Sequence, residues 1–364
     1  MTKHILFDPF QLGDLSLSSR IVMAPLTRGR AANNENKAND LIAEYYRQRA
    51  TAGLLITEGS QISRRAVGYH NTPGIYSKAQ IEGWKLTTRA VHQAGGKIFI
   101  QLWHVGRISH PDYLQGLRPL APSAIDPKIT IRTPNGKKPS VLPQEMTQLE
   151  IHQVVADFAQ AGANAMEAGF DGVEIHASNG YLLHQFFAPA SNTRMDEYGG
   201  NPENRSRILF ELLDALTQKM PVNRIGVRLN PSAHEIQGLS ITKDTLPTFD
   251  YLIDRMNEYP LAFLHLSEPF TNVKDVPYSE PEIARRYRPI YKGNLMINRG
   301  FTAETAMKVL DEGLADLVAF GVPFISNPDL VYRMQNDLPL AIADPSTYYT
   351  PGAAGYTDYP ALDQ

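Results

Sequence analysis

The sequence contains no cysteine among its 364 residues. The chain therefore forms no disulfide bond, no thiolate metal site and no cysteine nucleophile, a composition typical of proteins in a reducing compartment. It also lacks a run of about 20 apolar residues, and Asp8 and Pro9 interrupt the opening segment where a signal peptide needs continuous apolar residues. We expect a cytoplasmic protein that has no membrane partner.

The chain has no large excess of charge of one sign. Its 35 Lys and Arg residues nearly balance 38 Asp and Glu residues, so the formal net charge is −3. This balance gives no basic field that would attract nucleic acid, and a small molecule is the expected partner. The hydrophobic fraction of 43%, with 17 Tyr and 14 Phe, supplies a large core and excludes a disordered chain.

Short apolar runs alternate with longer stretches of helical periodicity along the chain. The runs are typical of buried parallel strands, and they cover residues 20–27, 53–59, 97–104, 172–178, 224–230, 261–268, 295–300 and 317–323. Helices are expected at 39–50, 78–94, 148–168, 202–220, 245–259, 281–291, 303–312 and 328–336. Eight such repeats predict an α/β fold, a closed (β/α)8 TIM barrel, as a single domain over residues 1–364.

Three segments fall outside this alternation. Residues 1–19 resemble a hairpin of two short strands around Gly13, suited to plugging the bottom of the barrel. Residues 105–147 form an insertion after the third strand, and residues 338–364 form a tail rich in Pro, Tyr and Gly. Because long insertions after barrel strands usually build lids or pocket walls, we expect this role for residues 105–147.

The fourth predicted strand ends in the most reactive set of side chains. Active sites of such barrels lie at the carboxyl ends of the strands, where His176, Asn179 and Tyr181 follow one another. His and Asn can donate two hydrogen bonds to one oxygen that gains negative charge, and a phenol suits proton delivery to a carbanion-like carbon. From this motif alone, a core histidine, a turn-forming Asn and a packing Tyr are an equally good interpretation.

Other strand ends add groups that fit a phosphorylated cofactor. Gly300 and Gly321 close the seventh and eighth strands, where barrels often hold a phosphate on backbone N–H groups. The first, third and fifth strands end in an alcohol, an amide, an indole and a fixed cation: Thr27, Gln101, Trp103 and Arg228. Flavin mononucleotide (FMN), which joins a phosphate to an uncharged ring system, fits this combination.

The carboxylates near strand ends predict no metal site. Glu58, Glu174 and Glu268 lie on separate strands without a paired His-x-His or Asp-x-Asp pattern. Glu174 falls within its strand, where an ion pair inside the barrel is expected. No G-x-S-x-G segment supports a serine nucleophile.

Six motifs in this order resemble one known family. They are MAPLTR (23–28), GYHNTPGIYS (68–77), QLWHVGR (101–107), GFDGVEIHASNGYLLHQF (169–186), DEYGG with ENR (196–205) and SNPDL (326–330). The chain resembles the old yellow enzyme family over essentially its whole length, in particular the alkene reductase and N-ethylmaleimide reductase branch. The resemblance implies non-covalent FMN in the barrel mouth, reduced by NADPH or NADH and reoxidised by an activated alkene such as an α,β-unsaturated aldehyde or ketone, a maleimide or a nitroalkene.

The resemblance also implies roles for residues around the flavin. Thr27 would bind the flavin O4, and Pro25 and Gly59 would contact the ring through backbone atoms. Gln101 would bind the pyrimidine edge. Arg228 would face N1 and O2, where negative charge collects on reduction.

A second set of implied roles concerns the substrate. His176 and Asn179 would bind its carbonyl oxygen while a hydride passes to the β-carbon, and Tyr181 would protonate the α-carbon. The pocket walls would be shaped by three aromatic residues: Tyr69, Trp103 and Tyr349.

One position departs from the family pattern. Val322 stands where most members carry an Arg that pairs with the FMN phosphate, which predicts weaker FMN retention. Arg299, between Asn298 and Gly300 in the preceding phosphate loop, could supply the missing charge or could point to solvent. Gly321 completes the predicted phosphate site.

Two other functions stay open from the sequence. Another FMN barrel dehydrogenase would use a Cys or Ser base, or a His–Asp pair, at the flavin. A binding protein with impaired FMN retention is the second alternative, and Val322 is the feature that favours it. The sequence leaves the physiological substrate open, and we expect a monomer or a small homo-oligomer.

Overall fold

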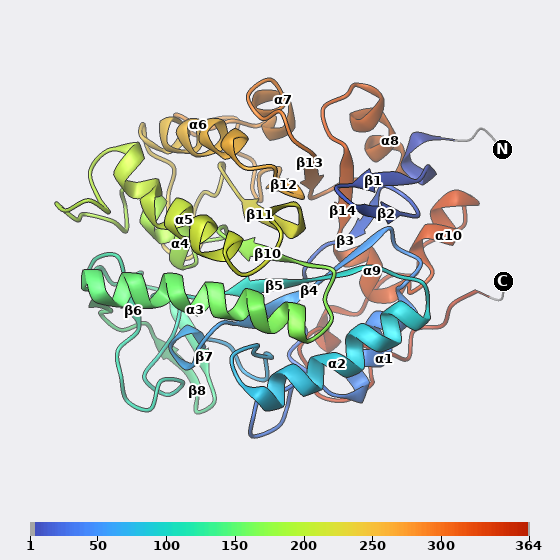
Figure 1. Cartoon of the computed structure of the whole chain (residues 1–364), viewed down its shortest axis with the longest axis horizontal. Coiled ribbons are helices and arrows are strands. Elements are labelled where there is room, and N and C mark those ends of the chain that lie inside the picture. The colour runs from blue at the N-terminus through green and yellow to red at the C-terminus, as the bar shows by residue number, and fades with distance from the viewer. Residues whose placement is uncertain (1–3, 363–364) are drawn as a thin grey trace.

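The computed structural model describes residues 4–362, so the first three residues of the predicted 1–19 segment and the last two of the 338–364 tail lie outside the described residues. Eight parallel strands form a closed barrel (Figure 1). They are β3 (Ile21–Met23), β4 (Leu54–Gln61), β5 (Ile98–Trp103), β10 (Gly172–His176), β11 (Ile225–Leu229), β12 (Phe263–Ser267), β13 (Leu295–Asn298) and β14 (Leu317–Phe320). The predicted TIM barrel is confirmed.

Helices cover the outside of the barrel between successive strands. The helices that correspond to the predicted ones have these observed bounds: α1 (Asp40–Gln48), α2 (Lys78–Gln93), α3 (Gln148–Glu167), α5 (Pro202–Thr217), α6 (Thr245–Arg255), α7 (Ile283–Tyr287), α8 (Ala303–Asp311) and α10 (Leu330–Gln335). Single 3₁₀ turns are η1 (Ile5–Phe7), η2 (Arg64–Ala66), η3 (Val222–Arg224), η4 (Met256–Glu258) and η5 (Pro345–Thr347). All eight predicted helices are present, several of them shorter than expected.

Two short helices were not predicted. Helix α4 (Leu182–Phe187) has six buried residues, too few to show a helical period in the sequence. Helix α9 (Val322–Ser326) replaces the predicted end of the eighth strand, which stops at Phe320. A Pro in the first turn of a helix is favourable, because its missing N–H is not needed there, and Pro323 occupies such a position.

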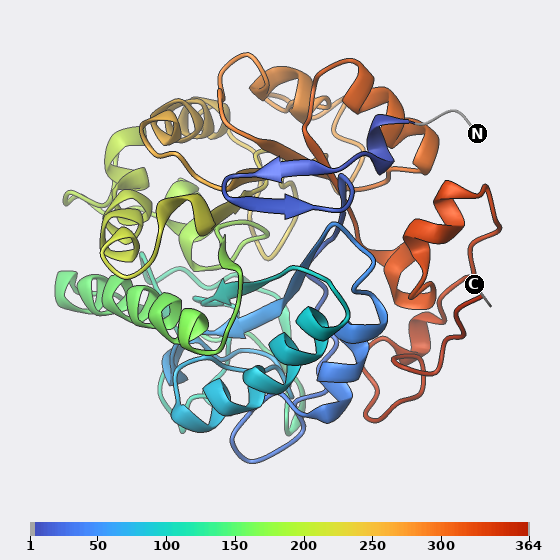
Figure 2. The same cartoon turned by 45° about the vertical axis from the view of Figure 1, so that its right-hand side comes forward.

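The N-terminal hairpin closes one end of the barrel, as predicted. Strands β1 (Phe10–Leu12) and β2 (Leu15–Leu17) pair in antiparallel fashion around Gly13, whose φ is +59°. Their buried leucines pack against residues from the first positions of the barrel strands, including Leu54 and Phe263. Figure 2 shows the hairpin lying across this end. The carboxyl ends of the strands are therefore the open side.

The insertion and the tail lie beside that open side. The insertion contains a parallel pair, β6 (Leu120–Ala121) with β9 (Gln144–Glu145), and a hairpin, β7 (Thr130–Thr133) with β8 (Gly136–Pro139). The tail returns to the loop after β3, where Arg28 donates to the carbonyls of Tyr348 at 3.1 Å and Gly355 at 2.6 Å. Arg30 donates to Thr347 O at 2.8 Å.

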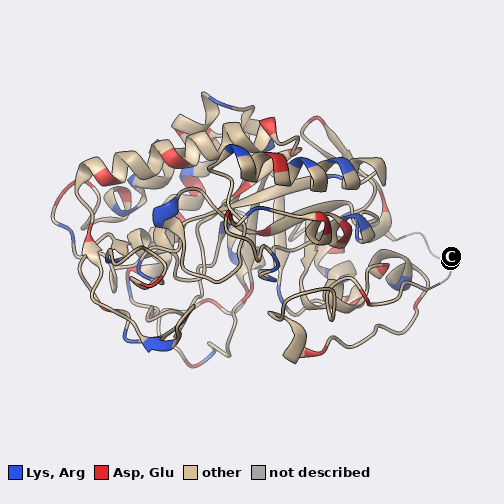
Figure 3. Ribbon diagram, turned by 90° about the horizontal axis from the view of Figure 1, so that it is seen from below, with Lys and Arg blue, Asp and Glu red and all other residues tan. Residues whose placement is uncertain are grey.

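Charged residues of both signs are interspersed along the outer elements (Figure 3). Several form ion pairs between helices or loops, such as Arg286 with Asp250 at 2.7 Å. Within residues 4–362, no helix combines the length and the apolar character needed to cross a membrane.

Candidate active site

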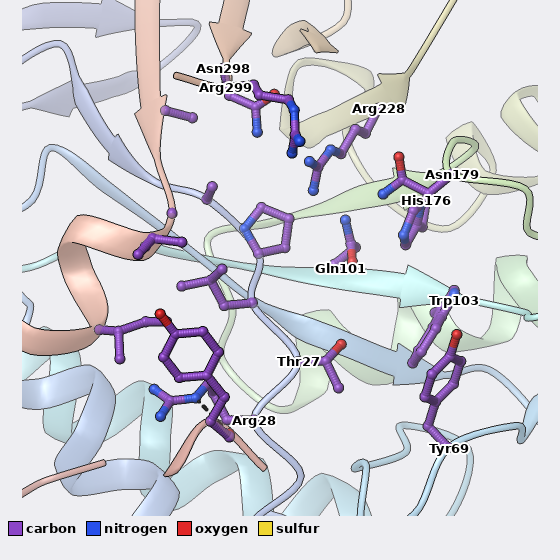
Figure 4. Close-up of a pocket in the computed structure, with 18 of the residues that line it drawn as sticks. Thr27, Arg28, Tyr69, Gln101, Trp103, His176, Asn179, Arg228, Asn298 and Arg299 are labelled. Carbon is purple, nitrogen blue, oxygen red and sulfur yellow. Dashed lines mark hydrogen bonds between the residues drawn. The ribbon is translucent and has the colours of Figure 1, made fainter. Parts of the chain in front are cut away.

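A cavity of about 1190 Å³ opens at the carboxyl ends of the barrel strands. Small-molecule pockets usually hold about 300–1000 Å³, so this cavity has room for a cofactor together with a second ligand. Figure 4 shows side chains from several strand ends around it. The predicted site residues that line it are Pro25, Thr27, Tyr69, Gln101, Trp103, His176, Asn179, Tyr181, Arg228, Asn298, Arg299, Gly300, Gly321, Val322 and Tyr349.

Gly59 is the predicted site residue that does not line the cavity. A side-chain Cβ built on it would lie 2.6 Å from the indole of Trp103, so its backbone lies behind that ring. The β4–β5 pairing also shifts register between Ile56 and Gly59. The contact of Gly59 with the flavin ring stays a prediction, and the structure adds a close packing contact between Gly59 and Trp103.

Glu58 fixes the loop that carries Pro25 and Thr27. The barrel strand stops at Met23, and the backbone N–H groups of Arg28 and Gly29 each donate to Glu58 Oε2 at 3.2 Å. Burial raises the pKa of Glu58 to about 7, and the two N–H donors oppose the rise. The loop therefore runs along the cavity with its amides turned towards the barrel.

His176, the last residue of β10, is held as a neutral imidazole. Burial lowers the pKa of His176 well below its ordinary value, and the nearby Arg228 cation lowers it further. Its Nδ1 lies 3.2 Å from Ser178 Oγ, whose hydroxyl can donate to it. A hydroxyl donating to Nδ1 leaves the ring proton on Nε2, the nitrogen available to a ligand.

Asn179 adopts a left-handed backbone conformation, with φ +57°. Asn tolerates this region better than most residues, and Gly180 follows with φ +81°. Nδ2 of the buried Asn230 donates to Asn179 Oδ1 at 3.3 Å, so Nδ2 of Asn179 is the atom left to donate into the cavity. Figure 4 shows Asn179 and His176 side by side. Asn230 was missed, although it closes the fifth predicted strand.

Tyr181 lies at the N-cap of α4 and faces a second phenol. Its hydroxyl is 2.9 Å from that of Tyr69, to which Gln237 Nε2 donates at 3.3 Å. Burial raises the pKa of Tyr181 well above its ordinary value, so it carries its proton at neutral pH. Gln237 belongs to the long loop after β11, and no sequence pattern marks it.

Arg228 is a buried cation that faces the cavity. Its side chain is 6% exposed, and among the described residues its Nε atom finds no hydrogen-bond partner. Burial lowers the pKa of Arg228, and the attraction of Glu174 opposes the shift; a guanidinium stays charged at neutral pH. An unpaired buried cation is costly unless a ligand supplies electron density.

Glu174 was expected to form an ion pair inside the barrel, but its partners there are an imidazole that we assign as neutral and an amide. Its carboxylate accepts from His265 Nδ1 at 2.6 Å and from Gln101 Nε2 at 2.8 Å. Burial lowers the pKa of His265, which we assign as a neutral donor. Since the Gln101 amide nitrogen donates to Glu174, the side-chain carbonyl oxygen of Gln101 is the atom available to accept a hydrogen bond from a ligand.

The opposite end of the cavity contains the predicted phosphate loops. The guanidinium of Arg299 donates to the carbonyls of Phe270 at 2.9 Å and Pro269 at 3.3 Å, and lies 3.7 Å from the centre of the Phe270 ring. Val322, at the start of α9, is 55% exposed. Arg299 is an exposed residue whose guanidinium these contacts hold along the cavity wall.

Comparisons with known proteins agree with this geometry. The family model described as the NADH:flavin oxidoreductase / NADH oxidase family matches residues 5–341. The chain is 41% identical to 12-oxophytodienoate reductase 1 of Oryza sativa subsp. japonica, over 99% of this chain and 93% of the relative. It is also 41% identical to a chanoclavine-I aldehyde reductase of Penicillium roqueforti, over 99% and 96% of the two chains.

Solved structures share the fold over their whole length. An old yellow enzyme homologue from Zymomonas mobilis superimposes with a TM-score of 0.93 at 41% identity, covering 98% of this chain and 99% of the other. Morphinone reductase in complex with tetrahydroNAD gives a TM-score of 0.92 at 41% identity, covering 98% of each chain.

Proposed function

The chain belongs to the NADH:flavin oxidoreductase / NADH oxidase family, and we propose that it reduces activated C=C bonds with bound FMN and NADPH or NADH as the reductant. The substrates would be α,β-unsaturated aldehydes and ketones, maleimides and nitroalkenes. One observation carries the proposal: two hydrogen-bond donors, His176 Nε2 and Asn179 Nδ2, adjoin the protonated phenol of Tyr181 in one cavity.

The residues present fit FMN. The buried Arg228 guanidinium, whose Nε has no partner within the described part of the chain, would hold the electron-rich pyrimidine edge, and the Gln101 carbonyl oxygen would accept from the same edge. Thr27 and Pro25 line the cavity from the fixed loop after β3. When bound, FMN supplies the electron-storing ring that accepts a hydride from the nicotinamide and gives it to the alkene.

The protein's own side chains prepare the alkene and complete its reduction. His176 and Asn179 would bind the carbonyl or nitro oxygen, and their N–H groups would stabilise the negative charge that develops there. Tyr181 would give its hydroxyl proton to the α-carbon. Trp103, Tyr69 and Tyr349 would pack against the substrate and exclude water.

Arg299 is proposed to supply the positive charge that the phosphate site lacks because Val322 stands where most family members carry an Arg. Substituting Arg299→Ala is expected to speed FMN dissociation by about tenfold, the loss of one charge-assisted hydrogen bond. Dissociation is measured from the fluorescence of released FMN. Arg299→Lys keeps the charge, so FMN should dissociate from it more slowly than from the Ala variant. Unchanged FMN retention in the Ala variant would exclude Arg299 as the compensating group.

Asn230 is expected to set the orientation of the Asn179 amide. In Asn230→Asp, a carboxylate would attract Asn179 Nδ2 and turn the amide oxygen into the cavity. A simple phenol, which needs donors for its oxygen, should bind the FMN-loaded protein about tenfold more weakly. Calorimetric titration measures this affinity. Asn230→Ala is the control and should lose less phenol affinity than Asn230→Asp. Wild-type phenol affinity in the Asp variant would contradict the assigned orientation of the Asn179 amide.

The proposed function is tested with purified protein. The visible spectrum should show bound flavin, NADPH or NADH should bleach it without oxygen, and 2-cyclohexenone should restore it with formation of the saturated ketone. A flavin that is reduced but not reoxidised by any activated alkene would favour another FMN barrel dehydrogenase. A protein that takes up no FMN would favour the binding-protein alternative, which Val322 supports. The cytoplasmic location and the monomeric or small oligomeric state stay predictions.

A further inference from the structure

We propose that Tyr69 is a positioning residue that directs the Tyr181 hydroxyl proton into the cavity and returns a proton to Tyr181 after each turnover. The inference rests on the proposed function, because it deepens the role of Tyr181 as the proton donor. In the sequence-based interpretation, Tyr69 only shapes the pocket.

Three polar side chains form a chain of hydrogen bonds along the cavity wall. Tyr69 Oη and Tyr181 Oη lie 2.9 Å apart, and Gln237 Nε2 donates to Tyr69 Oη at 3.3 Å. The residues come from the loop after β4, the N-cap of α4 and the loop after β11. The fold therefore brings three separate loops together at the two phenols.

Trp103 holds both phenol rings in place. Tyr69 stacks on its indole with ring centroids 5.1 Å apart. Figure 4 shows the two side chains next to each other. Tyr181 contacts the same indole edge-on at 4.9 Å and contacts the His176 ring edge-on at 4.9 Å. Rings packed on several sides do not turn freely, so the two hydroxyl groups remain within hydrogen-bond distance.

The Gln237 amide sets the direction of the chain. An amide nitrogen only donates, so the Tyr69 oxygen accepts from Gln237. The single proton of Tyr69 is then available to the Tyr181 oxygen, and the proton of Tyr181 is free to face the substrate. If the hydrogen bond ran in the opposite direction, Tyr181 would donate its only hydroxyl proton to Tyr69 and could not present it to the substrate.

The same chain explains how Tyr181 is reprotonated. When Tyr181 gives its proton to the substrate α-carbon, an O–H bond breaks, a C–H bond forms and a phenolate remains. Burial opposes this charge, because it raises the pKa of Tyr181 well above its ordinary value. The Tyr69 proton moves to Tyr181 along their hydrogen bond. Tyr69 is partly exposed next to the exposed His70, so water at the cavity mouth can restore its proton.

Tyr69→Phe tests the inference, since it removes the hydroxyl and keeps the ring that stacks on Trp103. In the FMN-loaded enzyme, reoxidation by 2-cyclohexenone should slow by about 10- to 100-fold, the effect of one hydrogen bond to a charged group. Its solvent deuterium isotope effect should increase, and flavin reduction by NADPH should stay within about twofold. Tyr259→Phe is the matched control, because its hydroxyl donates to Asp214 at 2.7 Å and Tyr259 does not line the cavity.

Gln237→Glu tests the direction of the chain independently. A carboxylate at this position would accept from Tyr69, so Tyr69 would in turn accept the Tyr181 proton and draw it out of the cavity. Alkene reduction should slow in this variant, and less in Gln237→Met. Adding Tyr69→Phe to Tyr181→Phe should cause no further loss, since Tyr69 acts through Tyr181.

The outcomes separate the inference from the proposed function. A wild-type enone rate and isotope effect in Tyr69→Phe, or an additive loss in the double variant, would overturn the role of Tyr69 while the enzyme still reduces alkenes. If the wild-type protein takes up FMN but reduces no activated alkene, the proposed function fails, and the inference fails with it.

Discussion

Tyr181→Phe is expected to slow the reduction of 2-cyclohexenone by about 100- to 10,000-fold, the usual contribution of a positioned general acid. The substitution keeps the ring that packs edge-on against Trp103 and His176, and it removes the hydroxyl with its proton and its hydrogen bond to Tyr69. Burial raises the pKa of Tyr181 well above its ordinary value, which keeps the donor protonated throughout the neutral range. The variant should therefore lose activity at every pH where the wild type is active.

The two half-reactions provide the measurement. In rapid mixing without oxygen, reduction of the flavin by NADPH should be nearly unchanged, because the hydroxyl donates its proton only to the alkene. Reoxidation by the enone should account for the whole loss. Equal slowing of both half-reactions would show that the substitution disturbs the flavin site, and it would contradict the proton-donor role.

Arg228→Met is expected to have the largest effect on the cofactor. Methionine approximates the length of the side chain but removes the buried cation, whose Nε has no hydrogen-bond partner in the described residues. Losing a charge-assisted interaction worth about 1.5–3 kcal/mol should weaken FMN binding by about 10- to 100-fold. If the loss falls mainly on reduced FMN, its two-electron potential should shift by about 30–60 mV to more negative values.

Potential and affinity are measured separately on the same variant. Equilibration with a redox dye gives the potential of protein reconstituted with excess FMN, and fluorescence titration gives the affinity. Arg228→Lys is the matched control, since it keeps the positive charge but replaces the planar guanidinium with an ammonium group. Wild-type values for both quantities in Arg228→Met would exclude Arg228 as a flavin ligand.

The barrel could be predicted because its strands are buried on both faces. Segments such as Ile98–Trp103 and Ile225–Leu229 therefore read as nearly continuous apolar runs, and the polar residues near their ends, Gln101 and Arg228, line the cavity at the open end. For the same reason His176 and Arg228, on adjacent strands paired in register, could be placed in one site.

The remaining details depend on geometry that the sequence pattern does not contain. Gly59 lies at a register shift in the β4–β5 pairing and packs closely against Trp103, a contact that the strand pattern does not predict. Gln237 and Tyr69 lie on loops whose paths no periodicity defines, so their hydrogen bond could not be foreseen. Asn230 could have been found, because it stands at a strand end in the same way as Arg228.

The attachment of the C-terminal tail has a consequence for the range of substrate sizes. Tyr349 lines the cavity, and the carbonyl of its neighbour Tyr348 accepts hydrogen bonds from both Arg28 and Arg30. The exposed Tyr349 ring can turn aside for a bulky alkene, but any movement of its backbone must displace a segment tied to two buried guanidinium groups. This side of the pocket should therefore resist widening. Selectivity against large substrates would depend on the hydrogen bonds that hold the C-terminal tail as much as on the Tyr349 ring.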